Sequence, residues 1–208
     1  MKNIIVAGIG TEVGKTIAAA ILTTLLNGDY WKPVQCGVDG NCDSAIMKKL
    51  LCAKKHRVHP PAYSLKMDAS PHHAARMENI CIDLQAIIPP ETTSPLIIES
   101  VGGVYVPILT ESLSIDLFKT WKCQWIVVSK HYLGSINHTL LTLDALKRHH
   151  IPVSGIIFNG EPNIDSETAI LRNSRVPFFN RLLPETSINR QTIQRYAKQW
   201  QYQLPLIS

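Results

Sequence analysis

The sequence predicts an α/β fold in which helices cover both faces of a mostly parallel β-sheet. Short apolar, β-branched runs alternate with longer helix-forming stretches along the chain, and such alternation is typical of parallel sheets. No internal repeat, linker or low-complexity tract interrupts it. Because 208 residues suit one domain better than two, we expect residues 1–208 to form a single domain.

Local signals place the individual elements. The first strand, 3–7, is an Ile- and Val-containing run that ends at Gly8, and the following helix, 15–26, stops at Asn27, Gly28 and Asp29. Further strands are expected at 30–34, 96–99, 125–129, 153–158 and, more weakly, 176–183. The other expected helices are 43–53, 135–150, 164–173 and 189–201. Residues 54–94 contain several Pro and His residues and give no clear prediction.

Composition excludes several classes of protein. With 45% hydrophobic residues the chain is not intrinsically disordered, and it has no stretch near the ~20 apolar residues of a membrane span. The net charge of +5 comes from dispersed Lys and Arg without interleaved aromatic residues, which favours a phosphate-handling site or a solvated surface over a nucleic-acid groove. Five cysteines without a C-x-x-C pair indicate reduced thiols and a cytoplasmic location rather than a zinc site.

The turn after the first strand has the chemistry of a phosphate-binding loop. Residues 8–16 read Gly-Ile-Gly-Thr-Glu-Val-Gly-Lys-Thr and open a predicted helix. Glycines let backbone N–H groups face phosphates, Lys15 would reach the terminal phosphates, and Thr16 offers a hydroxyl to Mg²⁺. The spacing is unusual, because five residues rather than four separate Gly8 from Gly14. The alternative is a tight turn that binds no ligand.

Charged residues at other strand ends are candidates for the same site, because ligands of parallel sheets bind at the carboxyl ends of strands. Glu99 ends one predicted strand and is followed by two glycines in Ser-Val-Gly-Gly. Beside a phosphate-binding loop its carboxylate would hold Mg²⁺, although a strand-end Glu is also a common ion-pair partner. Asp43 is a second candidate acid, or a helix cap. Lys32 would stabilise developing phosphate charge, or be solvated.

Several segments, in order over about residues 3–160, resemble dethiobiotin synthetases. The loop is similar to the family's G-T-D-T-E-V-G-K-T, and residues 31–37 are similar to Y-K-P-V-x-S-G. Residues 41–45 resemble N-S-D-A, and 99–108 resemble E-G-A-G-G-x-x-x-P-L. Leu-Gly-Ser-Ile-Asn-His at 133–138 and Phe-Asn at 158–159 continue the resemblance. The loop is shared with other P-loop NTPases, but Lys-Pro-Val together with Leu-Gly-x-Ile-Asn-His is specific.

The resemblance implies a fold, a reaction and a set of partners. The fold would be that of the P-loop NTPases. The reaction would be the ATP-dependent carboxylation and ring closure of 7,8-diaminopelargonic acid with CO₂, which gives dethiobiotin, ADP and phosphate in biotin biosynthesis. It would proceed through a carbamate and a mixed carbamic–phosphoric anhydride, with Mg²⁺ as cofactor. The protein would be a homodimer with each substrate site at the subunit interface, and would bind neither nucleic acid nor membranes.

The resemblance also assigns roles to residues of this chain. The residues implied in catalysis are Lys15, Lys32 and Thr11. Those implied in substrate binding are Thr11, Lys32, Cys36, Gly134 and Asn137, of which Asn137 would reach across the dimer. Those implied in ATP binding are Glu12, Val13, Gly14, Lys15, Thr16, Ile17, Asp43, Glu99, Ser100, Val101, Gly102, Asn159, Pro184, Glu185 and Thr186. Those implied as Mg²⁺ ligands are Thr16, Asp43 and Glu99.

This chain departs from the family pattern at several positions. Gly10 stands where the family has Asp, and Cys36 where it has a substrate-contacting Ser. Ser100 and Val101 replace Gly and Ala. A thiol is a weaker hydrogen-bonding group than a hydroxyl, so we expect these changes to affect substrate affinity and rate more than nucleotide binding.

Two other functions are compatible with the loop. One is a nucleotide-switch or partitioning ATPase, or a diverged relative that binds ATP but not the diamine, as the departures suggest. The other is amidation of a large corrinoid acid by a related enzyme. Such enzymes usually carry a glutaminase domain, for which 208 residues leave no room.

Overall fold

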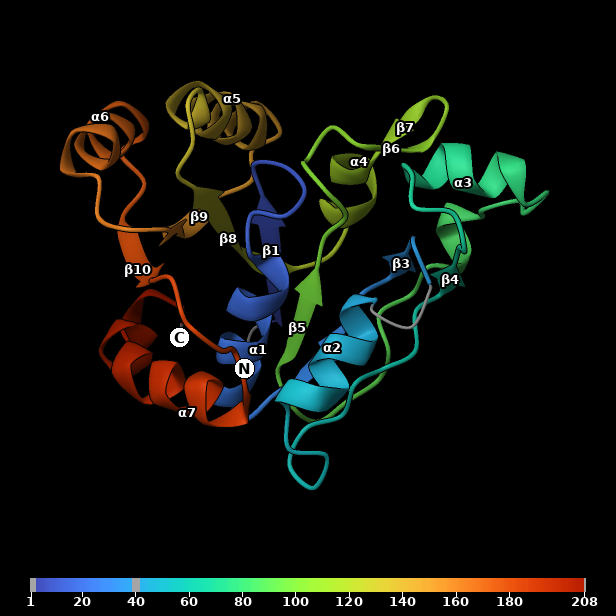
Figure 1. Ribbon diagram of the computed structural model, residues 1–208. Helices are drawn as coiled ribbons and strands as arrows, with labels where there is room; N and C mark the ends of the chain where they lie inside the picture. The colour runs from blue at the N-terminus through green and yellow to red at the C-terminus, as the bar shows by residue number, and fades with distance from the viewer. Residues whose placement is uncertain (1–2, 39–41, 208) are drawn as a thin grey trace.

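A computed structural model describes residues 3–38 and 42–207 and contains a six-stranded parallel sheet. The spatial order is β10–β9–β8–β1–β5–β2, and Figure 1 labels the strands from β10 to β5. The bounds are β1 (Asn3–Gly8), β2 (Asp29–Trp31), β5 (Leu96–Glu99), β8 (Cys123–Lys130), β9 (Val153–Asn159) and β10 (Phe178–Leu182). Every neighbouring pair in this sheet is parallel. The predicted α/β fold class is confirmed.

Helices cover both faces of the sheet (Figure 1). One layer contains α1 (Lys15–Leu25), α2 (Asp43–Leu50) and α7 (Arg190–Gln199), and the other contains α5 (Ser135–Arg148) and α6 (Ile164–Ser174). Successive side chains of β1 alternate between them: Ile4 and Val6 pack on the α1 side, and Ile5 and Ala7 on the α5 side. This alternation explains why β1 is apolar at every central position.

The predicted strand 30–34 is wrong as a single element. The chain forms β2 up to Trp31 and then β3 (Val34–Gln35), which pairs with β4 (Tyr63–Ser64) in a separate two-stranded sheet. Pro33 has no N–H to donate to a ladder, and its carbonyl accepts from the N–H groups of Ala62 and Tyr63 instead. The break leaves Lys32 between the two strands.

Several elements have no counterpart among those expected from sequence. They lie mostly in residues 54–118 and are β4, α3 (Pro71–Met77), η1 (Leu84–Ala86), β6 (Pro107–Leu109), β7 (Ser112–Leu113) and α4 (Ser114–Phe118). The chain also continues beyond α7 as η2 (Trp200–Leu206). The expected helix 43–53 ends earlier, at Leu50. Among the described residues, no helix has the length and apolar character needed to cross a bilayer.

Gly28, between α1 and β2, lies where the backbone approaches β5 closely. A Cβ at this position would clash with the carbonyl oxygen of Pro95, an oxygen that accepts from the N–H of Asp29. We therefore expect Gly28→Ala to lower the free energy of unfolding by about 1–3 kcal/mol through overpacking. Gly10→Ala is the matched control, since a Cβ there meets no atom within 4 Å. Urea denaturation of both variants tests this, and equal stability would contradict it.

Candidate functional site

The loop between β1 and α1 has a tightly defined backbone. Glu12 and Gly14 adopt positive φ angles of 54° and 98°, and Gly14 caps the first turn of α1. The side-chain amide of Asn159, at the end of β9, donates to the carbonyl of Val13 over 2.9 Å. A Cβ on Gly14 would lie 2.6 Å from that amide nitrogen. The loop thus leads into the N-terminus of a buried helix, which is a favourable site for anions.

Lys15, the first residue of α1, points back at this loop. Its ammonium donates to the carbonyl of Gly10 over 2.6 Å, and only 6% of the residue is exposed. Burial lowers the pKa of Lys15 to about 8, against the opposing attraction of Glu99. The charged form of Lys15 therefore lacks a directly bound carboxylate, and a phosphate group in the loop would supply the missing counter-charge.

Three oxygen-bearing side chains from separate elements meet beside the loop. Thr16 Oγ1, on α1, lies 2.6 Å from Asp43 Oδ1, at the start of α2. The same hydroxyl lies 3.1 Å from Glu99 Oε1, at the end of β5. The structure thus brings together the three residues predicted to hold Mg²⁺.

Lys32 joins the two carboxylates of this cluster. Its ammonium contacts Asp43 Oδ2 and lies 3.1 Å from Glu99 Oε1. Burial works to lower the pKa of Lys32, but Glu99 and Asp43 together outweigh it and the pKa is raised. Burial works to raise the pKa of Asp43, but Lys32, with hydrogen bonds from Thr16 and Gln35, lowers it. Lys32 is therefore a fixed cation at the site.

The oxygen cluster fits a hard divalent cation. A hydroxyl and two carboxylates are ligands that Mg²⁺ accepts, and Mg²⁺ commonly completes its shell with waters and substrate phosphates. Within residues 3–38 and 42–207, no group of three or more His, Cys, Asp or Glu side chains could hold a metal ion. The cluster itself consists of one hydroxyl and two carboxylates.

Sequence analysis missed two residues that support the cluster. Tyr30, fully buried in β2, donates its hydroxyl to Glu99 Oε2 over 2.7 Å. The side-chain amide of Gln35 donates to the carbonyl of Cys36 over 2.8 Å and approaches Asp43 Oδ2 at 3.3 Å. Both residues lie close to the Lys-Pro-Val segment in sequence. A polar side chain on a buried strand near Lys32 is therefore the sequence signal that could have identified them.

A cavity of about 490 Å³ opens beside the loop and the cluster. Its lining includes most of the loop and both lysines, together with Thr11, Cys36 and Val101. Residues 68–71, from the segment without a sequence prediction, form part of its wall. Burial raises the pKa of the Cys36 thiol to about 11, so this side chain faces the cavity as a neutral group.

The other residues that the resemblance implies in ATP binding lie on several elements. Ile17 follows Thr16 on α1. Ser100 is buried with a hydroxyl that has no hydrogen-bond partner among the described residues, and Gly102 lines the cavity at a positive φ of 34°. The segment 184–186 follows β10, and its Glu185 accepts hydrogen bonds from Arg195 and Tyr196 on α7.

Gly134 and Asn137 are not brought into this cavity. Gly134 caps the N-terminus of α5 and Asn137 lies in its first turn, and both are exposed. Neighbouring Leu133 is fully exposed as well. Asn41, part of the segment similar to N-S-D-A, lies outside the described residues.

The opposite pKa shifts of the two buried lysines can be measured. We expect the ammonium of Lys15 to titrate near pH 8 and that of Lys32 to remain charged, because only Lys32 contacts carboxylates. Since the pKa of Lys15 lies below its unfolded value, this group should add stability as pH rises from about 8 towards 10.5. Side-chain ¹³Cε NMR of labelled lysine measures both, and Lys32→Arg assigns the signals. Equal titration of the two lysines would disprove the contrast.

Comparisons with known proteins agree with this geometry. A family model described as an AAA domain matches residues 2–192. The ATP-dependent dethiobiotin synthetase of Chlamydia abortus is 45% identical over 95% of this chain and 94% of its own length. That of Cytophaga hutchinsonii is 44% identical over 95% of this chain and 96% of its own.

Solved structures of low identity share the fold. A putative plasmid partition protein from Borrelia burgdorferi, bound to AMPPNP, has a TM-score of 0.61 at 11% identity and covers 99% of this chain and 97% of its own. A ParA family ATPase from Chlorobium tepidum has a TM-score of 0.55 at 13% identity, covering 95% and 98%. The solved structures show the fold alone, whereas the near full-length identity to the synthetases shows that this chain belongs to the dethiobiotin synthetase family.

Proposed function

We propose that this chain carries out the ATP-dependent carboxylation and ring closure of 7,8-diaminopelargonic acid with CO₂ to form dethiobiotin. The observation that carries the proposal is the meeting of Lys15, Lys32 and the Thr16–Asp43–Glu99 cluster beside one cavity. That arrangement supplies a phosphate-binding loop, a fixed cation and hard oxygen ligands. The family relationship supplies the substrates.

The residues of this site would act by positioning and by charge. Phosphoryl transfer depends mainly on alignment and on stabilising the charge of the transferred group. Lys15 and the loop N–H groups would hold the ATP phosphates, and Lys32 would stabilise charge on the transferred phosphoryl group. Thr11 and Cys36 line the same cavity, where they would contact the diamine or its carbamate.

Mg²⁺ is the metal that we assign to the cluster. Thr16, Asp43 and Glu99 would hold it, and when bound it supplies positive charge to the phosphates. The base of ATP would lie against Asn159, at the end of β9, and the segment 184–186, which follows β10. Asn159 already fixes the loop through Val13, so base recognition and loop conformation would be linked.

We further propose a homodimer that completes the substrate site. Gly134 and Asn137 are exposed and outside the cavity, as expected if they serve the partner's site. Leu133, just before α5, and Ile136 and Leu141 on α5 expose apolar side chains. Residues 1–208 would act as one domain in the cytoplasm, where a reducing environment suits the five free cysteines.

Product formation tests the function directly. The chain, incubated with Mg-ATP, bicarbonate and diaminopelargonic acid, should give dethiobiotin by mass spectrometry, and omission of any one substrate should abolish it. Lys15→Ala and Lys32→Ala should each lower kcat by about 10²–10³-fold, the scale for losing a preorganised charge. Nucleotide binding without product at high diamine concentration would instead favour a nucleotide-switch ATPase or a diverged relative.

Cys36 tests the substrate half of the site. Cys36→Ser restores a hydroxyl that hydrogen-bonds better than the thiol, so we expect KM for the diamine to fall by about 2–10-fold, the value of one hydrogen bond. The KM for ATP should not change. Cys123→Ser is the control, because Cys123 is a half-buried thiol whose pKa is also raised by burial to about 11. An unchanged diamine KM in Cys36→Ser would place the substrate elsewhere.

A further inference from the structure

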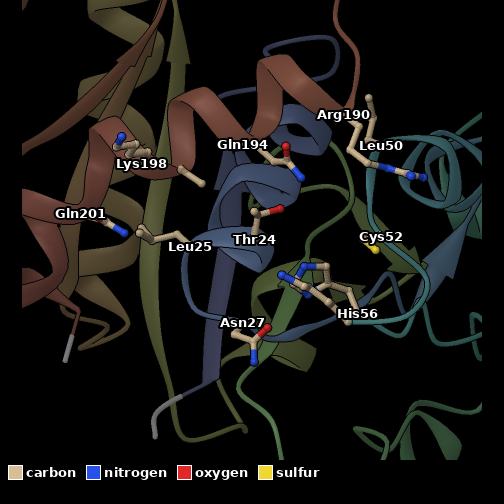
Figure 2. Close-up of a pocket in the computed structure, with 12 residues that line it drawn as sticks. Thr24, Leu25, Asn27, Leu50, Cys52, His56, Arg190, Gln194, Lys198 and Gln201 are labelled. Carbon is tan, nitrogen blue, oxygen red and sulfur yellow. The ribbon is translucent and has the colours of Figure 1, made fainter.

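A second cavity lies at the end of α1 opposite to the phosphate-binding loop. It has a volume of about 440 Å³, within the usual range of small-molecule sites. It is an open cavity lined by the C-terminal end of α1, residues from 50–56, one face of α7 and the start of η2 (Figure 2). Because α1 has 11 residues, about 15 Å of helix separates this cavity from the loop. It is therefore distinct from the proposed active site.

The charged residues that line this cavity are all positive. Lys55, Arg190 and Lys198 line it, and none of its lining residues has a carboxylate. Within the described chain, the ammonium groups of Lys55 and Lys198 have no hydrogen bond or ion pair, and Arg190 donates to the backbone carbonyl of Leu51 over 2.9 Å.

Neutral hydrogen-bonding groups lie between these cations. The side-chain amides of Asn27, Gln194 and Gln201 line the cavity and have no partner among the described residues. Figure 2 shows Gln194 between Arg190 and Lys198 along α7, facing Thr24 on α1. Because a carbonyl only accepts, His56 Nδ1 donates to the carbonyl of Gly28 over 2.9 Å, which fixes the imidazole ring in the cavity wall.

An adjoining cavity extends the positive surface. It shares Lys55 and His56 with the first cavity and adds Lys48, Lys54 and Arg57. The carboxylate of Asp29 also lines it, but its oxygens already accept from the N–H of Arg57 and the hydroxyl of Thr92 and contact His59. The single negative charge of Asp29 is therefore outnumbered by the charges of Lys48, Lys54, Lys55 and Arg57.

We propose that the cavity between α1 and α7 binds a small molecule that carries more than one oxyanion group, either phosphate or carboxylate. Arg190 and Lys198 are eight residues apart, about 12 Å along the helix axis, so two charged groups match them better than one. The amides between them would bind the uncharged middle of the ligand. A bound polyanion would also relieve the repulsion among the three cations.

NMR titration with tripolyphosphate and with citrate, in metal-free buffer, tests the site. Both probes are polyanions, one with phosphate and one with carboxylate groups. At least one should shift the side-chain amides of Asn27, Gln194 and Gln201 with a saturable dependence. Signals of residues 8–16 report separately on the phosphate-binding loop, so failure of the proposed enzymatic function would not affect this readout.

Two matched variants distinguish a built site from general attraction. The double variant Arg190→Gln/Lys198→Gln should weaken probe binding at this cavity at least about tenfold, or about 1.4 kcal/mol. The control double variant Lys122→Gln/Arg172→Gln loses the same charge elsewhere and should change probe binding less than about twofold. Thermal unfolding checks that both fold. The proposal is overturned if neither probe shifts the three amides at millimolar concentration, or if both variants weaken binding equally. The more effective probe identifies the anionic group.

Discussion

The buried ion pairs of Lys32 with Asp43 and Glu99 set the geometry of the whole site. A charge taken out of water requires a close partner, and removal of one partner from a buried pair costs about 3–5 kcal/mol. These three residues come from the β2–β3 break, the start of α2 and the end of β5. Because they must meet, the positions of all three elements relative to α1 are constrained, and Thr16 is placed against both carboxylates.

The two lysines of the site have opposite electrostatic roles. Lys32 is already neutralised by carboxylates and holds them in place, so its charge does not depend on a ligand. Lys15 is buried against a carbonyl and its pKa is lowered to about 8, so a bound phosphate stabilises its charged form. Binding of a nucleotide would therefore complete the charge balance at Lys15, whereas Lys32 is charged before any ligand binds.

The sequence allowed prediction of those parts of the fold and site that depend on local chemistry. The loop, its helix and the strand-end acid Glu99 follow from short motifs at strand ends, and the structure brings them together. Tyr30 was missed because its role depends on the pairing of β2 with β5, which sets Tyr30 opposite Ile97. The break at Pro33 was missed because β3 has two residues and exists only through its pairing with β4. Such short elements leave no periodic signal.

Gly10 and Cys36, which differ from the family pattern, take no part in the ion pairs of Lys32 with Asp43 and Glu99. A Cβ on Gly10 would meet no atom within 4 Å, so the loop does not require glycine there and the missing carboxylate leaves the Lys32 ion pairs intact. At Cys36, the protonation state of the thiol determines how the side chain interacts with an anionic substrate. A thiolate would repel an anionic carbamate, but burial raises the thiol pKa to about 11, so at neutral pH the side chain is uncharged. Replacing a hydroxyl by this thiol weakens one hydrogen bond without adding a repulsive charge, which is why a dethiobiotin synthetase site can accommodate it.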